Sequence, residues 1–245
     1  MNDNNSTQTG NVPTAKASAQ PAGLGEARVL GHAPRIEPLH VTELTSDLLG
    51  LVERMTRVNI AINARRKEEL IDFISDQAAG VSEADISAHV ANLSEIVRTM
   101  LRHPDLFTAQ TDIGIQLLGN GTLTPRDREL AILRIGWLCQ APYEWGEHVH
   151  VAKAVGITSE EIERVTQGSS APGWSEHERA IMRAVEELHA NAIISDETWA
   201  TLAKTLNDKQ LIELPIVIGQ YQTVAYYQNS LRLRLHDGNL GLKAR

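Results

Sequence analysis

Apolar residues recur through most of this chain at spacings of three and four, which is the period of an amphipathic α-helix. The clearest run begins after Ser82, a residue type that caps helices, and its apolar positions are Ile86, Val90, Leu93 and Val97. Alternation with period two is confined to residues 231–235, where a frayed helix end explains it as well as a strand does. The sequence therefore predicts an all-α domain of about eight helices.

Capping signals mark where the later helices begin. Thr124-Pro125 precedes an apolar run that ends near Trp137, and Pro142 opens a helix that Gly156 ends. Further helix starts are predicted at Thr158, Ser175, Ser195 and either Asn207 or Asp208.

The last predicted helix, about 208–231, contains the most apolar stretch of the chain. Apolar residues lie nearly all round it, so we expect it at the centre of the domain or in a subunit interface of a stable homo-oligomer. Glu213, Pro215 and two glutamines interrupt residues 211–227, which indicates a buried helix and not a membrane span.

Composition divides the chain into a domain and two tails. Residues 1–33 are rich in small and polar side chains and have scarcely any large apolar ones, so they cannot offset the entropy of ordering. We predict a disordered tail over 1–33, or an arm that orders only against a partner subunit, followed by a helical domain over 34–235 and a short C-terminal tail over 236–245.

Charge and composition exclude several classes of partner. The chain has 31 acidic and 23 basic side chains, a formal charge of −8, and no concentrated basic face. It should therefore bind neither nucleic acid nor an anionic membrane. Residues 1–22 lack the apolar stretch of a targeting signal, so we expect a soluble cytoplasmic protein.

Cysteine and histidine usage argues against a cofactor or metal. Cys139 is the single cysteine, which excludes an internal disulfide, a thiolate zinc site and a two-cysteine redox centre. His148 and His150 are two residues apart, so a helix places their rings about 200° apart, whereas a helical metal pair needs a spacing of four. No phosphate-binding glycine loop and no serine-hydrolase motif is present. We expect no cofactor and no metal.

Glu129 is the first candidate for a chemical role. It shares a helix face with Ile132, Leu133 and Gly136, so its carboxylate heads an apolar stripe. Such a carboxylate is costly unless it has a partner or is protonated. The alternative is a surface glutamate that the helix dipole stabilises.

The next predicted helix carries a second acidic group and an imidazole. Glu144 and His148 are one turn apart above a stripe formed by Val151, Ala152 and Val155. They are near enough to hydrogen-bond and to act as a general acid/base pair. The alternative is a solvated pair of the kind common on helix surfaces.

Three segments resemble the carboxymuconolactone decarboxylase family: Leu123 to Arg134, Tyr143-Glu-Trp-x-x-His148, and Ala152-x-x-x-Gly156-Ile-Thr. The likeness extends over about residues 34–235. That family shares its fold with the alkylhydroperoxidase D-type proteins, so the resemblance implies a compact helical bundle that forms homotrimers or homohexamers.

The resemblance also implies which branch the chain is nearer to. The alkylhydroperoxidase branch has a C-x-x-C pair, and its two cysteine positions fall here on Ala141 and Glu144, while Glu129 and His148 match its acidic and histidine positions. Disulfide-based peroxide reduction is therefore not expected. The decarboxylase branch has the Tyr-Glu-Trp-x-x-His pattern, and its type reaction removes a carboxylate from a muconolactone in the catabolism of aromatic compounds.

On this resemblance, His148 is the expected catalytic acid, with Glu129 and Glu144 holding its tautomer or setting its pKa. Arg134 is a candidate to anchor a substrate carboxylate, unless it pairs with an acid of a neighbouring helix. Tyr143, Trp145 and Tyr221 are the other candidate substrate-binding residues.

The main hypothesis is a cofactor-independent decarboxylase that acts on a small carboxylated or lactone substrate, and two alternatives stay open. One is a peroxidase-like antioxidant protein that uses Cys139 alone, and the other is a non-catalytic oligomeric scaffold. The enzyme hypothesis predicts that Glu129 and His148 meet within direct or one-water hydrogen-bond reach at the rim of the core and line a pocket that Glu144 also touches, with burial raising the pKa of Glu129.

Overall fold

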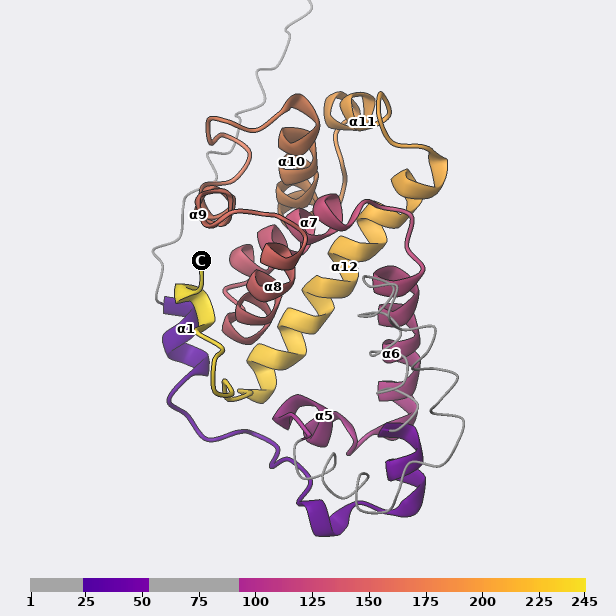
Figure 1. Cartoon of the computed structure of the whole chain (residues 1–245), viewed down its shortest axis with the longest axis vertical. Helices are drawn as coiled ribbons and strands as arrows, with labels where there is room; N and C mark the ends of the chain where they lie inside the picture. The colour runs from indigo at the N-terminus through magenta and orange to yellow at the C-terminus, as the bar shows by residue number, and fades with distance from the viewer. Residues whose placement is uncertain (1–23, 53–92) are drawn as a thin grey trace, which may run out of the picture.

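The computed structural model describes residues 24–52 and 93–245, and every regular element in these ranges is helical (Figure 1). The predicted all-α fold is confirmed. The α-helices are α1 (Leu24–Val29), α5 (Glu95–Met100), α6 (Pro104–Gly119), α7 (Pro125–Leu138), α8 (Pro142–Ala154), α9 (Ser159–Gln167), α10 (Glu176–Asn191), α11 (Asp196–Leu202) and α12 (Asp208–Leu231). Residues 46–52 are also helical, and η1 (Val41–Glu43) and η2 (Gly241–Lys243) are 3₁₀ turns.

The predicted caps are present where the chain enters these helices. Five capping side chains accept a hydrogen bond from a backbone N–H three residues on: Thr124, Thr158, Ser175, Ser195 and Asn207. The run predicted from Ser82 lies outside the described residues as far as 92, and α5 begins after it at Glu95.

Helix α7 is the central element of the domain. It packs against α8, α9, α10 and α12, and ten consecutive residues, 127–136, are buried. Figure 1 shows α12 running diagonally past α7 and α8, with α6 on its other side. Because α7 is enclosed on all sides, its polar side chains must find their partners inside the protein.

Helix α12 has one buried and one exposed side. Leu214, Val217 and Ile218 are at most 1% exposed, whereas Ile212 and Ile216 are 63% and 50% exposed in the single chain. Within the part of the chain that the structure describes, neither this helix nor another is long and apolar enough to cross a membrane.

Both ends of the predicted domain extend further than the composition indicated. Val29 of α1 is buried, and Glu26 accepts a hydrogen bond from the backbone N–H of Leu242. Leu242 and Ala244 are buried in the main core. Leu242 and Ala244 thus join η2 to the main core, and the hydrogen bond from Leu242 to Glu26 connects this segment to α1.

Candidate active site

A buried carboxylate and an imidazole lie in direct contact between α7 and α8. The turn Cys139–Ala141 joins these helices, and Gln140 in it adopts a left-handed conformation with φ of 49°. Oε2 of Glu129 lies 2.7 Å from Nδ1 of His148, and the glutamate is fully buried while the imidazole is 13% exposed. The predicted contact between Glu129 and His148 is present.

The charge on Glu129 is stabilised from two sides. Nε of Arg128 donates to its other oxygen at 3.2 Å, and Arg128 is itself buried. Burial acts to raise the pKa of Glu129, but His148 and Arg128 together lower it below its ordinary value. The expected rise was therefore wrong, because the Arg128 guanidinium and the His148 imidazole both lie against the carboxylate.

The contact with Glu129 gives the two nitrogens of the His148 imidazole different roles. When Nδ1 donates to Glu129, Nε2 is the nitrogen left to exchange a proton with a ligand. Tyr221 of α12 packs edge-on against the imidazole, with ring centroids 4.8 Å apart and an interplanar angle of 87°. Burial, followed by the charges of Glu129 and Glu144, raises the pKa of Tyr221 well above its ordinary value, so the phenol stays neutral.

Glu144 has the most unusual environment among the described residues. It is 2% exposed, and neither carboxyl oxygen has a hydrogen-bond partner. The predicted hydrogen bond to His148 is absent, because that imidazole is bound to Glu129. Burial raises the pKa of Glu144 well above its ordinary value and so favours the neutral carboxylic acid.

Gly136 of α7 has no side chain, and the carboxyl group of Glu144 occupies the space next to it. A Cβ atom at position 136 would lie 3.3 Å from Oε1 of Glu144, closer than most such contacts. A buried acid without a partner is costly to stability, so it points to a site that a ligand completes.

Cys139 lies next to this acid at the end of α7. Burial, and then the charge of Glu144, raise the pKa of the Cys139 thiol to about 12. The thiol is therefore protonated near neutral pH and is a weak nucleophile.

With this geometry in place, the chain can be compared with known proteins. The model of the carboxymuconolactone decarboxylase family matches residues 104–187. The predicted resemblance is confirmed. The matched segment contains α6 to α9 and most of α10, and thus both Glu129 and His148. No curated protein sequence matches the chain significantly.

Solved structures of the alkylhydroperoxidase type share the fold. An alkylhydroperoxidase AhpD core, an uncharacterized peroxidase-related protein from Ralstonia eutropha, has a TM-score of 0.60 at 15% identity, covering 86% of this chain and 99% of its own. A protein of unknown function from Agrobacterium tumefaciens, titled as a candidate antioxidant defence protein AhpD, has a TM-score of 0.52 at 19% identity, covering 56% and 94%. A cysteine-to-alanine variant of the debrominase Bmp8, in complex with 2,3,4-tribromopyrrole, has a TM-score of 0.55 at 14% identity, covering 84% and 94%.

Three other residues of the carboxymuconolactone decarboxylase-like pattern lie away from the Glu129–His148 pair or are held by other groups. Arg134 forms an ion pair of 2.8 Å with Glu186 of α10, which is the alternative that the sequence left open. Trp145 is fully buried and donates to the carbonyl of Ala244. Tyr143 is buried with its ring edge-on to His236.

Sequence reasoning missed Arg128 and the special place of Gly136. Arg128 directly precedes Glu129 in the sequence. Side chains of adjacent residues in a helix point in different directions, so the spacing of these two residues did not predict their contact. His150 is exposed, as expected. Among the described residues, no group of three or more His, Cys, Asp or Glu side chains is placed to hold a metal ion.

Proposed function

We propose that the chain is a cofactor-independent acid/base enzyme that acts on a small carboxylated or lactone substrate, in the manner of a decarboxylase. The observation that carries the proposal is the 2.7 Å contact between the buried Glu129 and His148, beside the unpartnered acid of Glu144. A neutral acid and a partnered imidazole in one site are what proton transfer at a carbon next to a carbonyl requires.

Each group has a separate part in the proposed reaction. Loss of CO2 leaves an electron pair that delocalises onto the substrate carbonyl oxygen, where Glu144 donates a hydrogen bond. Protonated His148 then delivers its Nε2 proton to the carbon. Glu129 stabilises the imidazolium and fixes its tautomer, so it is a positioning residue.

The comparisons support a small-molecule site of this kind. The family model covers the segment that holds both proposed proton-transfer groups. One structural neighbour is titled as a complex with the small aromatic 2,3,4-tribromopyrrole. At 14% identity this neighbour shows only a similar fold. From its ligand we propose for this chain only that the substrate is a small cyclic molecule.

The test is CO2 release from a panel of small carboxylated lactones and β-keto acids with purified protein. His148→Ala should lower turnover by about 10²-fold or more, the usual contribution of a general acid. Glu144→Gln keeps a hydrogen-bond donor and removes the acidic proton, so it should retain part of the activity. His150→Ala, on the exposed side of α8, is the matched control and should have little effect. Equal turnover by His148→Ala and His150→Ala would contradict the proposal.

The antioxidant alternative draws on the alkylhydroperoxidase-type neighbours. It requires a reactive thiolate, and the raised pKa of Cys139 weighs against one. Peroxide consumption by the wild-type protein that disappears in Cys139→Ser would favour this alternative. If neither activity is found and no ligand protects His148, the scaffold interpretation takes its place.

A further inference from the structure

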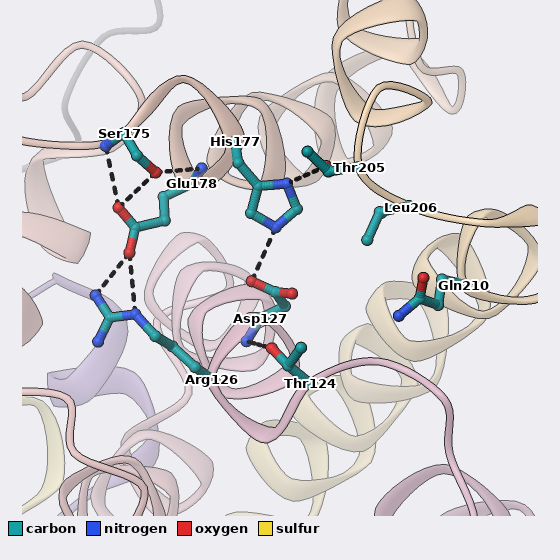
Figure 2. Close-up of a pocket in the computed structure, with 9 residues that line it drawn as sticks. All are labelled: Thr124, Arg126, Asp127, Ser175, His177, Glu178, Thr205, Leu206 and Gln210. Atoms are coloured by element: carbon teal, nitrogen blue, oxygen red, sulfur yellow. Dashed lines mark hydrogen bonds and ion pairs between the residues drawn. The ribbon is translucent and has the colours of Figure 1, made fainter.

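A second carboxylate–imidazole pair lies at another surface of the domain, at a pocket of about 370 Å³ (Figure 2). Oδ1 of Asp127, in the first turn of α7, lies 3.0 Å from Nε2 of His177 in α10. Nδ1 of the same imidazole lies 2.8 Å from the hydroxyl of Thr205, in the loop between α11 and α12. Figure 2 shows the His177 ring between these two groups.

This arrangement matches the geometry of an activated nucleophile. A hydroxyl, a base and an orienting carboxylate are each within hydrogen-bond distance of the next. In the tautomer that keeps Nε2–H towards Asp127, Nδ1 is free to accept the proton of Thr205. Thr205 is exposed, so its oxygen is accessible from the pocket.

The pocket also provides a donor for a developing negative charge. Gln210 lines it, and the amide nitrogen of this side chain has two N–H groups. One of them donates to the carbonyl of Thr122, and within the described contacts the other has no acceptor. Figure 2 shows Gln210 and Leu206 on one side of His177, and Arg126 and Glu178 on the other.

Arg126 is not available to donate to this developing charge, because its guanidinium group is already paired with two carboxylates. It binds Glu161 and Glu178 at 2.5 and 2.7 Å. This ion-pair network fixes the wall of the pocket and leaves no free cation of this residue for an anionic ligand. A neutral acyl compound is the class that suits these surroundings.

We propose that Asp127, His177 and Thr205 form a second catalytic centre that hydrolyses small neutral esters. Thr205 Oγ1 bonds to the acyl carbon, the bond from that carbon to the leaving alcohol breaks, and the hydroxyl proton passes through His177 to the alcohol. Water then attacks the acyl-threonine, again through His177, and releases the carboxylic acid. This centre is independent of the Glu129–His148 site.

The experiment uses p-nitrophenyl acetate with the full-length protein. Thr205→Val removes the hydroxyl while keeping the branched shape, and it should lower p-nitrophenol release by about 10²-fold or more. Thr205→Ser should retain turnover. Thr201→Val is the matched control, because the Thr201 hydroxyl donates to the carbonyl of Glu197 just as the Thr205 hydroxyl also donates to that of Leu202, but Thr201 has no imidazole partner among the described contacts.

Two further measurements keep the proposal falsifiable. Mass spectrometry of the acid-quenched protein should locate the acetyl group on Thr205. Gln210→Glu keeps the acceptor that caps α12 and removes both side-chain N–H groups, including the one that donates to the carbonyl of Thr122, so it should slow release and also lower the thermal midpoint slightly. Release by Thr205→Val equal to that of Thr201→Val, or acetylation confined to lysines, would overturn the proposal.

Discussion

Asp127 and Glu129 lie two residues apart in α7, and each carboxylate holds an imidazole from a different helix. Asp127 binds His177 of α10, and Glu129 binds His148 of α8. Two residues correspond to about 200° round a helix, so the carboxylates point to opposite sides. One buried helix therefore supports both the proposed decarboxylase-like site and the second pocket.

The first prediction concerns the charge of Glu129. Its lowered pKa means that it stabilises the fold fully above its ordinary value of 4.5, and that this contribution is lost as pH falls through the lower folded-state value. Glu129→Gln should lower the free energy of unfolding by about 1–3 kcal/mol at pH 7, and by much less near pH 3. Urea unfolding at both pH values measures this. The control is Glu197→Gln, whose side chain is 84% exposed and should change little at either pH.

The second prediction concerns Glu144 and has the opposite sign. A raised pKa means that its contribution to stability is fully present below 4.5 and is lost as pH rises, because the unfolded chain ionises and the folded one does not. Glu144→Gln should therefore unfold at a higher temperature than the wild type at pH 8, and this advantage should disappear near pH 4. A pH-independent difference between the two proteins would contradict the buried neutral acid.

The third prediction concerns assembly. Ile212, Ile216 and Tyr226 form an exposed stripe on α12, which we expect a second copy of the chain to cover in a trimer or hexamer. Ile216→Glu should reduce the mass measured by light scattering at micromolar concentration. Ile193→Glu, at an exposed residue outside this helix, should leave the mass unchanged. A monomeric wild-type protein would remove the idea.

The fourth prediction concerns the contact between α1 and the C-terminal segment. Val29→Asp places a charge at a buried position and should lower the thermal midpoint by several degrees, since about 1–2 kcal/mol of apolar burial is lost. Ala27→Asp alters an exposed residue of the same helix and is the control. Equal midpoints for the two variants would show that α1 adds nothing to the fold.

What the sequence predicted well was local or depended on a regular period. The caps at Thr124 and Ser175 involve residues three apart, so the order of residues is enough to find them. The contact of Glu129 with His148 followed from two apolar stripes on consecutive helices that pack into one core.

What the sequence did not predict depends on contacts between distant segments. Trp145 bonds the carbonyl of Ala244, 99 residues away, and this contact makes a predicted ligand-binding residue part of the core. His177 meets Asp127 over 50 residues and Thr205 over 28, and no spacing rule connects them. Glu144 has no hydrogen-bond partner because His148, one turn away, binds Glu129 instead, and the periodicity of the sequence does not show which of the two acids His148 binds.

The neutral acid of Glu144 gives the protein a built-in spectroscopic label. A protonated carboxyl has an infrared carbonyl stretch that is separate from those of ionised carboxylates and of the peptide backbone, and this band should shift when an oxygen without a hydrogen-bond partner gains one. Difference spectra against Glu144→Gln would assign the band. Ligand binding next to Gly136 could then be followed by light absorption, before any substrate is known and without labelling the chain.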